Sequence, residues 1–360
     1  MIQLNANRNF QRTSVSAPAR VPCSPAKWAI ILAFALLYLS WGTTYLAIRI
    51  GVESFPPALF GGSRVATAGL ILLVYLAIRG ESIRLRWSQL ACVGVVGVLL
   101  FVGGNGLITY AEKSVASGVT SVLAATTPFW LALLETIWPR GERLRLRGWL
   151  GLFAGLGGVL LLLAEQLRAP AGAWLGIGPL LVLASAASWA LGSFALRHGS
   201  PGASHLTSAA YQMLIGGTCL FVIGLTLGEG RTLALEQFTP RSVYAFTHLL
   251  IVGSLVGFVA YNWLMSHVSV TLVGTYAYVN PVVAILVGWL IQDEKITPWI
   301  IGGMTIILAG VALVRSGTAS SSSRRGARWV DVSPPGNQSE DDVPGDEELS
   351  DGEPLVSRLR

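Results

Sequence analysis

The chain has 360 residues, of which 52% are hydrophobic and 12% are charged, and its formal net charge is +6. Soluble globular domains carry about 25% charged residues, so this composition excludes an ordinary soluble domain and indicates that lipid is the main solvent. The basic residues lie between apolar stretches, where they are expected to fix orientation in a bilayer. We therefore expect a lipid-bilayer partner and no nucleic-acid partner.

Apolar stretches long enough to cross a bilayer recur along the whole chain. A spanning helix needs about 20 apolar residues, whereas a barrel strand needs about 10. The sequence therefore predicts an all-α membrane protein with ten transmembrane helices. In chain order the expected spans are 28–48, 58–78, 90–110, 115–138, 148–164, 174–196, 206–227, 243–265, 268–291 and 298–314.

The segments outside these spans complete the expected organisation. Residues 1–27 form an N-terminal segment, 28–165 and 174–315 form two five-helix repeats, and 316–360 form a disordered acidic tail. Lys and Arg concentrate on the side of the membrane that holds the N-terminus. By the positive-inside rule both termini are predicted to be cytoplasmic.

An internal repeat relates the two halves. Pro128 matches Pro281 at an offset of 153 residues, and Arg49 matches Arg197 at an offset of 148. A repeat of five helices is an odd number, so the two copies must have opposite orientations in the membrane. Inverted repeats of this kind build many transporters around one site near the bilayer midplane. The sequence predicts two inverted repeats around a central cavity.

The motifs of both halves resemble a known family. The residues that carry the resemblance are Ser40–Tyr45, Arg49, Pro56, Pro57, Arg64, Pro128, Glu142–Leu144, Pro281 and Glu294–Ile296. Together they resemble the EamA-domain transporters of the drug/metabolite transporter superfamily, in particular the YedA-like branch. The resemblance implies ten helices, a bacterial inner-membrane location, a cavity open to alternate sides and transport of small metabolites.

Two prolines are candidate gating residues, because Pro128 and Pro281 lie inside the fourth and ninth expected spans. Proline removes a backbone donor and frees the carbonyl of the preceding turn. In a membrane that carbonyl must find a partner or line a polar cavity. We predict a kinked gating helix in each half, and a static packing kink is the alternative.

Arg64 is a candidate substrate-binding residue, because it lies well inside the second expected span. A buried arginine is costly unless it is paired or hydrated, and its guanidinium can bind a carboxylate or phosphate with two hydrogen bonds. It could instead extend to a lipid headgroup. The repeat places Gln212 at the matching position of the second half, so Gln212 is predicted to line the cavity too.

Aromatic and amide side chains complete the predicted cavity wall: Trp41, Trp189, Tyr261, Tyr278 and Asn280. Trp and Tyr usually mark the membrane interface, but these positions are central in their spans. Helix packing and interface anchoring are the alternatives. For Glu135, an acid inside the fourth span, an ion pair with a loop arginine such as Arg143 is favoured over proton exchange.

The function predicted from the sequence is secondary transport of small organic metabolites, amino-acid-like or drug-like, in the export direction. The alternative is a membrane-embedded enzyme or lipid-handling protein that uses the same cavity. We expect no catalytic residues, no cofactor and no metal site, because the four histidines lack metal-binding spacing. Coupling to an ion or proton is left open, as is the choice between a monomer and a homodimer.

Overall fold

The computed structural model describes residues 25–115, 117–139, 141–162, 164, 176–199, 204–233, 238–292 and 297–317. They belong to one compact unit, Met1–Ala319. Most of the N-terminal segment 1–27 and nearly all of the expected acidic tail 316–360 lie outside the described residues.

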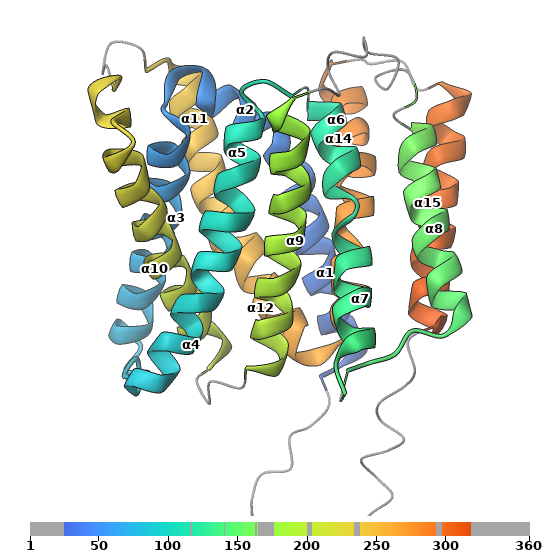
Figure 1. Ribbon diagram of the computed structural model, residues 1–360, viewed down its shortest axis with the longest axis horizontal. Helices are drawn as coiled ribbons and strands as arrows, with labels where there is room; N and C mark the ends of the chain where they lie inside the picture. The colour runs from blue at the N-terminus through green and yellow to red at the C-terminus, as the bar shows by residue number, and fades with distance from the viewer. Residues whose placement is uncertain are drawn as a thin grey trace, which may run out of the picture. The chain divides into compact units, whose positions relative to one another are not determined.

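Helices follow one another along each half of the chain (Figure 1). The first half contains α1 (Lys27–Gly42), α2 (Thr44–Ser54), α3 (Pro57–Ile78), α4 (Trp87–Gly97), the π-helix η1 (Val98–Gly106), α5 (Leu107–Ala111), α6 (Ser117–Ala124), α7 (Thr127–Ile137) and α8 (Leu146–Leu162). The second half contains α9 (Ile177–His198), α10 (His205–Thr226), the short 3-10 helix η4 (Glu229–Arg231), α11 (Pro240–His248), the π-helix η6 (Leu249–Phe258), α12 (Val259–His267), α13 (Val270–Gly274), α14 (Tyr276–Gln292) and α15 (Pro298–Gly317).

Eight helical stretches in the described part of the chain are long and apolar enough to cross a membrane. They are Lys27–Ser54, Pro57–Ile78, Trp87–Ala111, Val119–Ile137, Ile177–His198, His205–Thr226, Pro240–His267 and Pro298–Gly317. The protein is therefore a multi-pass helical membrane protein. The expected spans 148–164 and 268–291 correspond to shorter apolar helices, Leu146–Leu162 and Val270–Val283.

Threonine side chains mark the points where three of the spans break. The hydroxyl of Thr43 donates to Ser40 O between α1 and α2, that of Thr126 to Leu123 O before α7, and that of Thr275 to Leu272 O before α14. Each hydroxyl binds a carbonyl in the preceding turn, at the point where the regular helix is interrupted. A polar backbone group inside a membrane needs a hydrogen-bond partner. These threonine hydroxyls supply one at each break and so lower the energetic cost of interrupting the helix.

The two prolines that the sequence repeat aligns occupy different local positions. Pro128 lies in the first turn of α7, directly after a break, where its missing N–H has no intrahelical acceptor to lose. Pro281 lies inside α14, more than one turn beyond the break at Thr275. The sequence match is thus not matched by the same local geometry.

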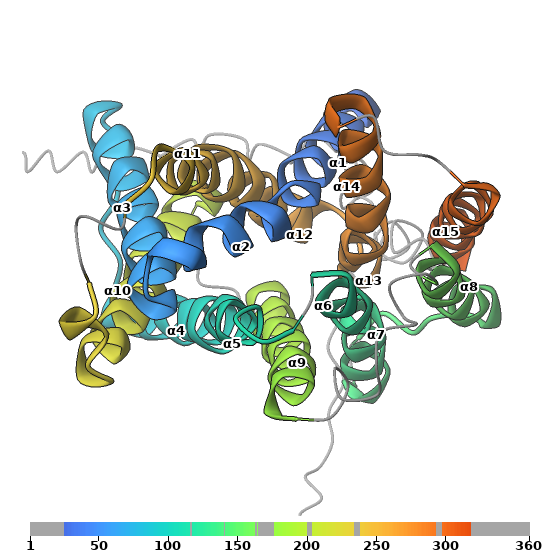
Figure 2. The same cartoon turned by 90° about the horizontal axis from the view of Figure 1, so that it is seen from above.

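Two closely packed helix pairs flank the centre of the bundle, α3 with α10 and α8 with α15 (Figure 2). Glycines allow both contacts. A Cβ on Gly62 would lie 2.4 Å from Phe221 N, and one on Gly310 would lie 2.7 Å from Gly155 N. Close backbone approach through small residues is the usual way in which membrane helices associate. Each pair joins one helix from each half of the chain.

Candidate functional site

One cavity lies among elements of both halves and has a volume of about 100 Å³. It is lined by side chains from α1, α2, α3, η1, α5, α6, α7, α9, η6 and α14. Both π-helices contribute lining residues, and widened helical turns of this kind are frequent at functional sites. The polar lining residues are Thr44, Tyr45, Arg64, Asn105, Thr127, Ser185, Ser254 and Asn280, and the large aromatic ones are Trp41, Phe101, Trp189, Phe258 and Tyr276.

Arg64 is the positively charged side chain of this lining. Arg64 is only 4% exposed. Its guanidinium donates to Asn105 Oδ1 at 2.9 Å and to Ser254 Oγ at 3.1 Å. Its Nε has no hydrogen-bond partner among the described residues. The partners are neutral, and no carboxylate within the described chain pairs with Arg64. The cavity wall therefore holds a positive charge that neutral dipoles orient without neutralising.

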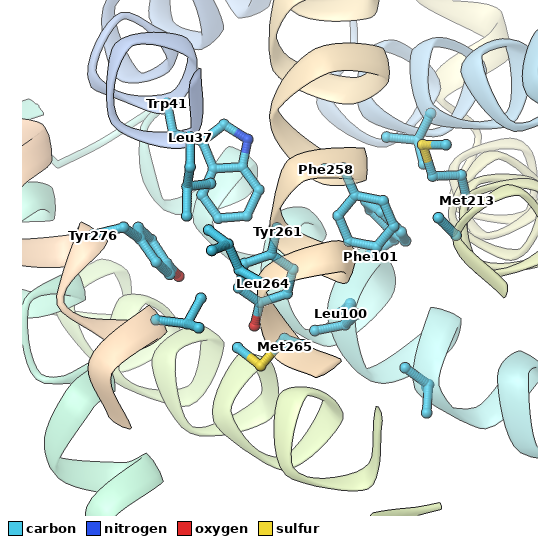
Figure 3. Packing of buried hydrophobic residues seen from close by; sticks show 14 of the residues in the cluster. Leu37, Trp41, Leu100, Phe101, Met213, Phe258, Tyr261, Leu264, Met265 and Tyr276 are labelled. Atoms are coloured by element: carbon cyan, nitrogen blue, oxygen red, sulfur yellow. The ribbon is translucent and has the colours of Figure 1, made fainter. Parts of the chain in front are cut away.

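An aromatic cluster of four residues, Trp41, Trp189, Tyr261 and Tyr276, shares three of its members with the cavity lining. Figure 3 shows Trp41, Tyr261 and Tyr276 close together in the core. The ring centroid of Trp41 lies 4.7 Å from that of Tyr276, 5.1 Å from that of Tyr261 and 5.4 Å from that of Trp189. Hydrogen bonds fix the rings, because Trp41 Nε1 donates to Gly253 O at 3.0 Å and Trp189 Nε1 donates to Tyr261 OH at 3.2 Å. The Tyr261 hydroxyl also bonds Ser193. The cluster thus joins α1, α9, α12 and α14 beside the cavity.

One face of α9 connects the cavity, the aromatic cluster and one end of the bundle. Ser185, Trp189, Ser193 and Arg197 follow at intervals of four residues, so their side chains lie along the same side of the helix. Ser185 and Trp189 line the cavity, Ser193 bonds Tyr261 beneath it, and Arg197 lies near the C-terminal end of α9. Tyr261 of the aromatic cluster therefore lies between the cavity and the C-terminal end of α9.

An ion pair and a contact between a histidine and a glutamate join the two halves at the C-terminal end of α9. Arg197 Nη2 lies 3.1 Å from Glu142 Oε1, and Arg197 Nη1 donates to Met265 O at 2.8 Å. Beside this pair, His198 Nε2 lies 2.8 Å from Glu135 Oε1. Both acids belong to the first half of the chain and both basic residues to the second. We name these four residues the paired end of the bundle.

Glu135 does not contact the partner that the sequence predicted for it. Arg143 was predicted, but the carboxylate of Glu135 contacts His198 and accepts the backbone N–H of Glu142 at 2.7 Å. Glu135 is 1% exposed. The sequence reasoning considered the nearest loop arginine, whereas the fold brings the end of α9 next to the end of α7.

Four of the seven predicted cavity residues lie in the cavity wall: Trp41, Arg64, Trp189 and Asn280. Tyr261 lies in the aromatic cluster and does not line the cavity. Neither Pro128 nor Pro281 lines it. These placements leave the predicted roles in transport and gating to experiment.

Tyr278 and Gln212 lie away from the cavity. The Tyr278 hydroxyl donates to Leu152 O on α8 at 3.2 Å. Residues two positions apart point about 200° apart around a helix, so Tyr278 cannot share the face on which Tyr276 and Asn280 line the cavity. Gln212 is fully buried on α10 against the backbone of Gly97. The repeat therefore does not place Gln212 beside Arg64.

Several lining residues were not singled out from the sequence. Asn105 and Ser254 are the partners of Arg64, and they lie on the two π-helices. Asn105 is flanked by Gly103, Gly104 and Gly106, which was a usable signal for irregular backbone. Ser254 lies in an apolar run that contains no comparable signal.

The helical spans and a cavity lined by side chains of both halves are typical of membrane transporters, and comparisons with known proteins give the family. The model of the EamA-like transporter family matches residues 27–164 and 176–316. The chain belongs to this family.

Curated relatives agree with that assignment. The inner membrane transporter YedA of Escherichia coli strain K12 is 35% identical over 285 residues, which cover 78% of this chain and 89% of YedA. A protein of Streptantibioticus cattleyicolor named "Probable terminal-alkyne amino-acid exporter" is 26% identical over 297 residues, which cover 82% of this chain and 95% of that protein. A solved crystal structure with 22% identity superposes with a TM-score of 0.65, covering 84% of this chain and all of that chain, and so supports the fold.

Proposed function

We propose that this protein is a secondary transporter that exports small metabolites bearing a carboxylate group, with amino-acid-like compounds as the substrate class. The substrate would bind in the cavity lined by Arg64, and the two halves would open it alternately to each side of the bacterial inner membrane. The proposal includes ten spanning segments arranged as two inverted repeats, 28–165 and 174–315, with both termini cytoplasmic.

The observation that carries this proposal is the unpaired charge of Arg64. A buried cation is costly unless an anion or several hydrogen bonds compensate it. Arg64 has neutral partners, and its Nε remains without one among the described residues. A carboxylate entering the cavity would supply the missing negative charge and could accept two guanidinium hydrogen bonds.

The dimensions and lining of the cavity support a small substrate. Its volume of about 100 Å³ is below the roughly 300–1,000 Å³ of pockets for drug-sized ligands. The aromatic faces of Trp41, Trp189 and Tyr276 offer an apolar or cation-binding surface next to Arg64. A relative named as an amino-acid exporter is consistent with such a solute. We favour the amino-acid-like class over the drug-like class.

The arrangement of the two ends supports alternating access. The paired end joins acids of the first half to basic residues of the second, and the aromatic cluster separates it from the cavity. In alternating access one repeat moves against the other. Opening of the paired end would therefore require these contacts between the halves to break. Helix breaks near Pro128 and Pro281 would provide the flexible points, which keeps both prolines as gating candidates.

The test is a comparison of metabolite levels inside and outside bacterial cells that lack the protein, contain it, or contain Arg64→Gln. We expect amino-acid-like carboxylates to accumulate outside only in cells with the unchanged protein. Arg79→Gln, an exposed position at the end of the same helix, is the matched control and should export normally. A lipid change or a chemically converted product, without export, would instead support a lipid-handling protein or an enzyme.

A further inference from the structure

An acidic side chain lies one helical turn beyond the cavity wall. Glu112 follows α5 directly, and its backbone N–H donates to the carbonyl of Ile108, which lines the cavity. Residues four apart lie on the same face of a helix, so Glu112 continues the face of α5 that borders the cavity. The paired end lies at the C-terminal end of α9, and Glu112 does not belong to it.

The carboxyl group of Glu112 is buried without a hydrogen-bond partner. The residue is 2% exposed, and neither carboxylate oxygen has a partner among the described residues. An ionised carboxylate in such surroundings loses the solvation that water gave it and gains no compensating bonds. The protonated acid, which carries no net charge, is the form that this site accommodates at lower cost.

Tyr45 connects Glu112 with the cavity. Its side chain lines the cavity and lies within electrostatic range of Glu112. Asn280, from the second half of the chain, also lines the cavity, and its Oδ1 has no hydrogen-bond partner among the described residues. A change in the charge of Glu112 can therefore act on the cavity wall through Tyr45.

Among the residues that the structure describes, one charged side chain acts on Glu112. Arg49 on α2, one turn beyond Tyr45, is the cation that acts on it. Lys113 is its exposed neighbour in the chain, and Arg64 on α3 is directed to Asn105 and Ser254. The basic residues of α9 lie at the paired end. Burial raises the pKa of Glu112 to about 8, and the positive charge of Arg49 opposes this rise only in part.

We propose that Glu112 is the proton-binding site that couples transport to the proton gradient, an inference that rests on the proposed transport function. In the conformation described here the carboxyl holds its proton. When opening of the bundle hydrates the site, the O–H bond breaks, the carboxylate keeps the electron pair and the proton passes to water. Reprotonation from water restores the buried form, so one proton is carried per conformational cycle.

The first test needs no knowledge of the substrate. Dicyclohexylcarbodiimide enters apolar sites and reacts with protonated carboxylic acids, and the modified residue is identified by peptide mass spectrometry of the purified full-length protein. We expect Glu112 to be modified, with half-maximal modification at a pH near 8. Glu53→Gln, which removes an exposed acid of α2, should leave this profile unchanged. Lack of modification, or a midpoint near the ordinary value of about 4.3, would overturn the proposal.

The second test measures coupling. Proteoliposomes containing a mixture of isotope-labelled amino acids are given a proton gradient, and release is followed for the unchanged protein, Glu112→Gln and Glu53→Gln. We expect the gradient to accelerate release for the unchanged protein and Glu53→Gln, and the acceleration to fall at least about tenfold for Glu112→Gln, which cannot lose a proton. Exchange without a gradient should survive in all three.

The two proposals fail in different ways. If no amino acid is released by any variant while the carbodiimide profile holds, the substrate class is wrong and the protonation site stands. If release is normal and Glu112→Gln responds to the gradient as the unchanged protein does, the coupling role of Glu112 is wrong and the transport function stands.

Discussion

The paired end and the surroundings of Glu112 treat buried acids in opposite ways. Glu135 is 1% exposed and Glu112 is 2% exposed, so burial does not distinguish them. Glu135 has His198 and a backbone N–H as partners, whereas Glu112 has no hydrogen-bond partner in the described chain. Hydrogen-bond partners, rather than depth, therefore decide which protonation state of a buried carboxyl is favoured.

The same contrast separates two mechanical roles. At the paired end, side-chain contacts join the two halves, and in the proposed transport cycle this end opens when water replaces those contacts. At Glu112, a neutral acid can remain buried, and in the proposed cycle a gain of charge favours opening. The proposal thus assigns closure by attraction to the paired end and proton sensitivity to the surroundings of Glu112.

The largest expected effect comes from making the same substitution in both acids. Glu135→Gln removes the charge from the contact with His198 and is expected to destabilise the protein by about 1.5–3 kcal/mol, the usual contribution of a hydrogen bond to a charged group. Glu112→Gln breaks no hydrogen bond among the described residues and should leave stability unchanged or raise it. Thermal unfolding of the two variants in detergent, at one pH, measures the difference. Equal losses would erase the distinction between the two sites.

A somewhat smaller effect is expected from pH alone. Because the pKa of Glu112 is raised to about 8 in the folded protein, its contribution to stability is present at low pH and is lost as the pH rises through 8. The loss is about 1 kcal/mol between one pH unit below and one above that pKa. Unfolding temperatures of the unchanged protein should therefore fall over this interval relative to those of Glu112→Gln. Parallel curves for the two proteins would count against a raised pKa.

The smallest effect concerns the exposed ion pair of the paired end. The side chains of Arg197 and Glu142 are 20% and 29% exposed, so each single charge reversal is expected to shift the opening equilibrium by only about 0.2–1 kcal/mol. Arg197→Glu should speed thiol labelling of a cysteine placed at Ser193, up to about fivefold. Adding Glu142→Arg should slow it again. An unchanged labelling rate in both variants would show that the Arg197–Glu142 pair does not close the bundle.

Sequence reasoning found the class of protein because long apolar stretches have one stable arrangement in lipid. It also singled out Arg64, Trp41, Trp189 and Asn280, which line the cavity, since polar or large side chains near the middle of a span are unfavourable unless they face protein or a cavity. A repeat offset gives no helix face, however. Gln212 was therefore predicted to line the cavity because it matches Arg64 in the repeat, although it packs against Gly97 and does not line the cavity.

Glu112 was missed for a related reason. It lies one residue beyond the apolar span Trp87–Ala111, where an acidic residue suggests an exposed loop. Its burial depends on helices from distant parts of the sequence, and the local sequence pattern does not reveal which helices pack there. The predicted partner of Glu135 was wrong for the same reason, because His198 lies on α9, far from Glu135 in the sequence.

The most direct test of the account is amino-acid counterflow into proteoliposomes that contain the unchanged protein, Arg64→Gln or Arg79→Gln. Counterflow measures exchange across the cavity without a proton gradient and so isolates binding of the carboxylate by Arg64. The account predicts uptake of labelled amino acids by the unchanged protein and by Arg79→Gln, and at least about a tenfold loss for Arg64→Gln, since removal of a charge-assisted contact costs about 1.5–3 kcal/mol. Undiminished uptake by Arg64→Gln, at equal amounts of inserted protein, would contradict the account.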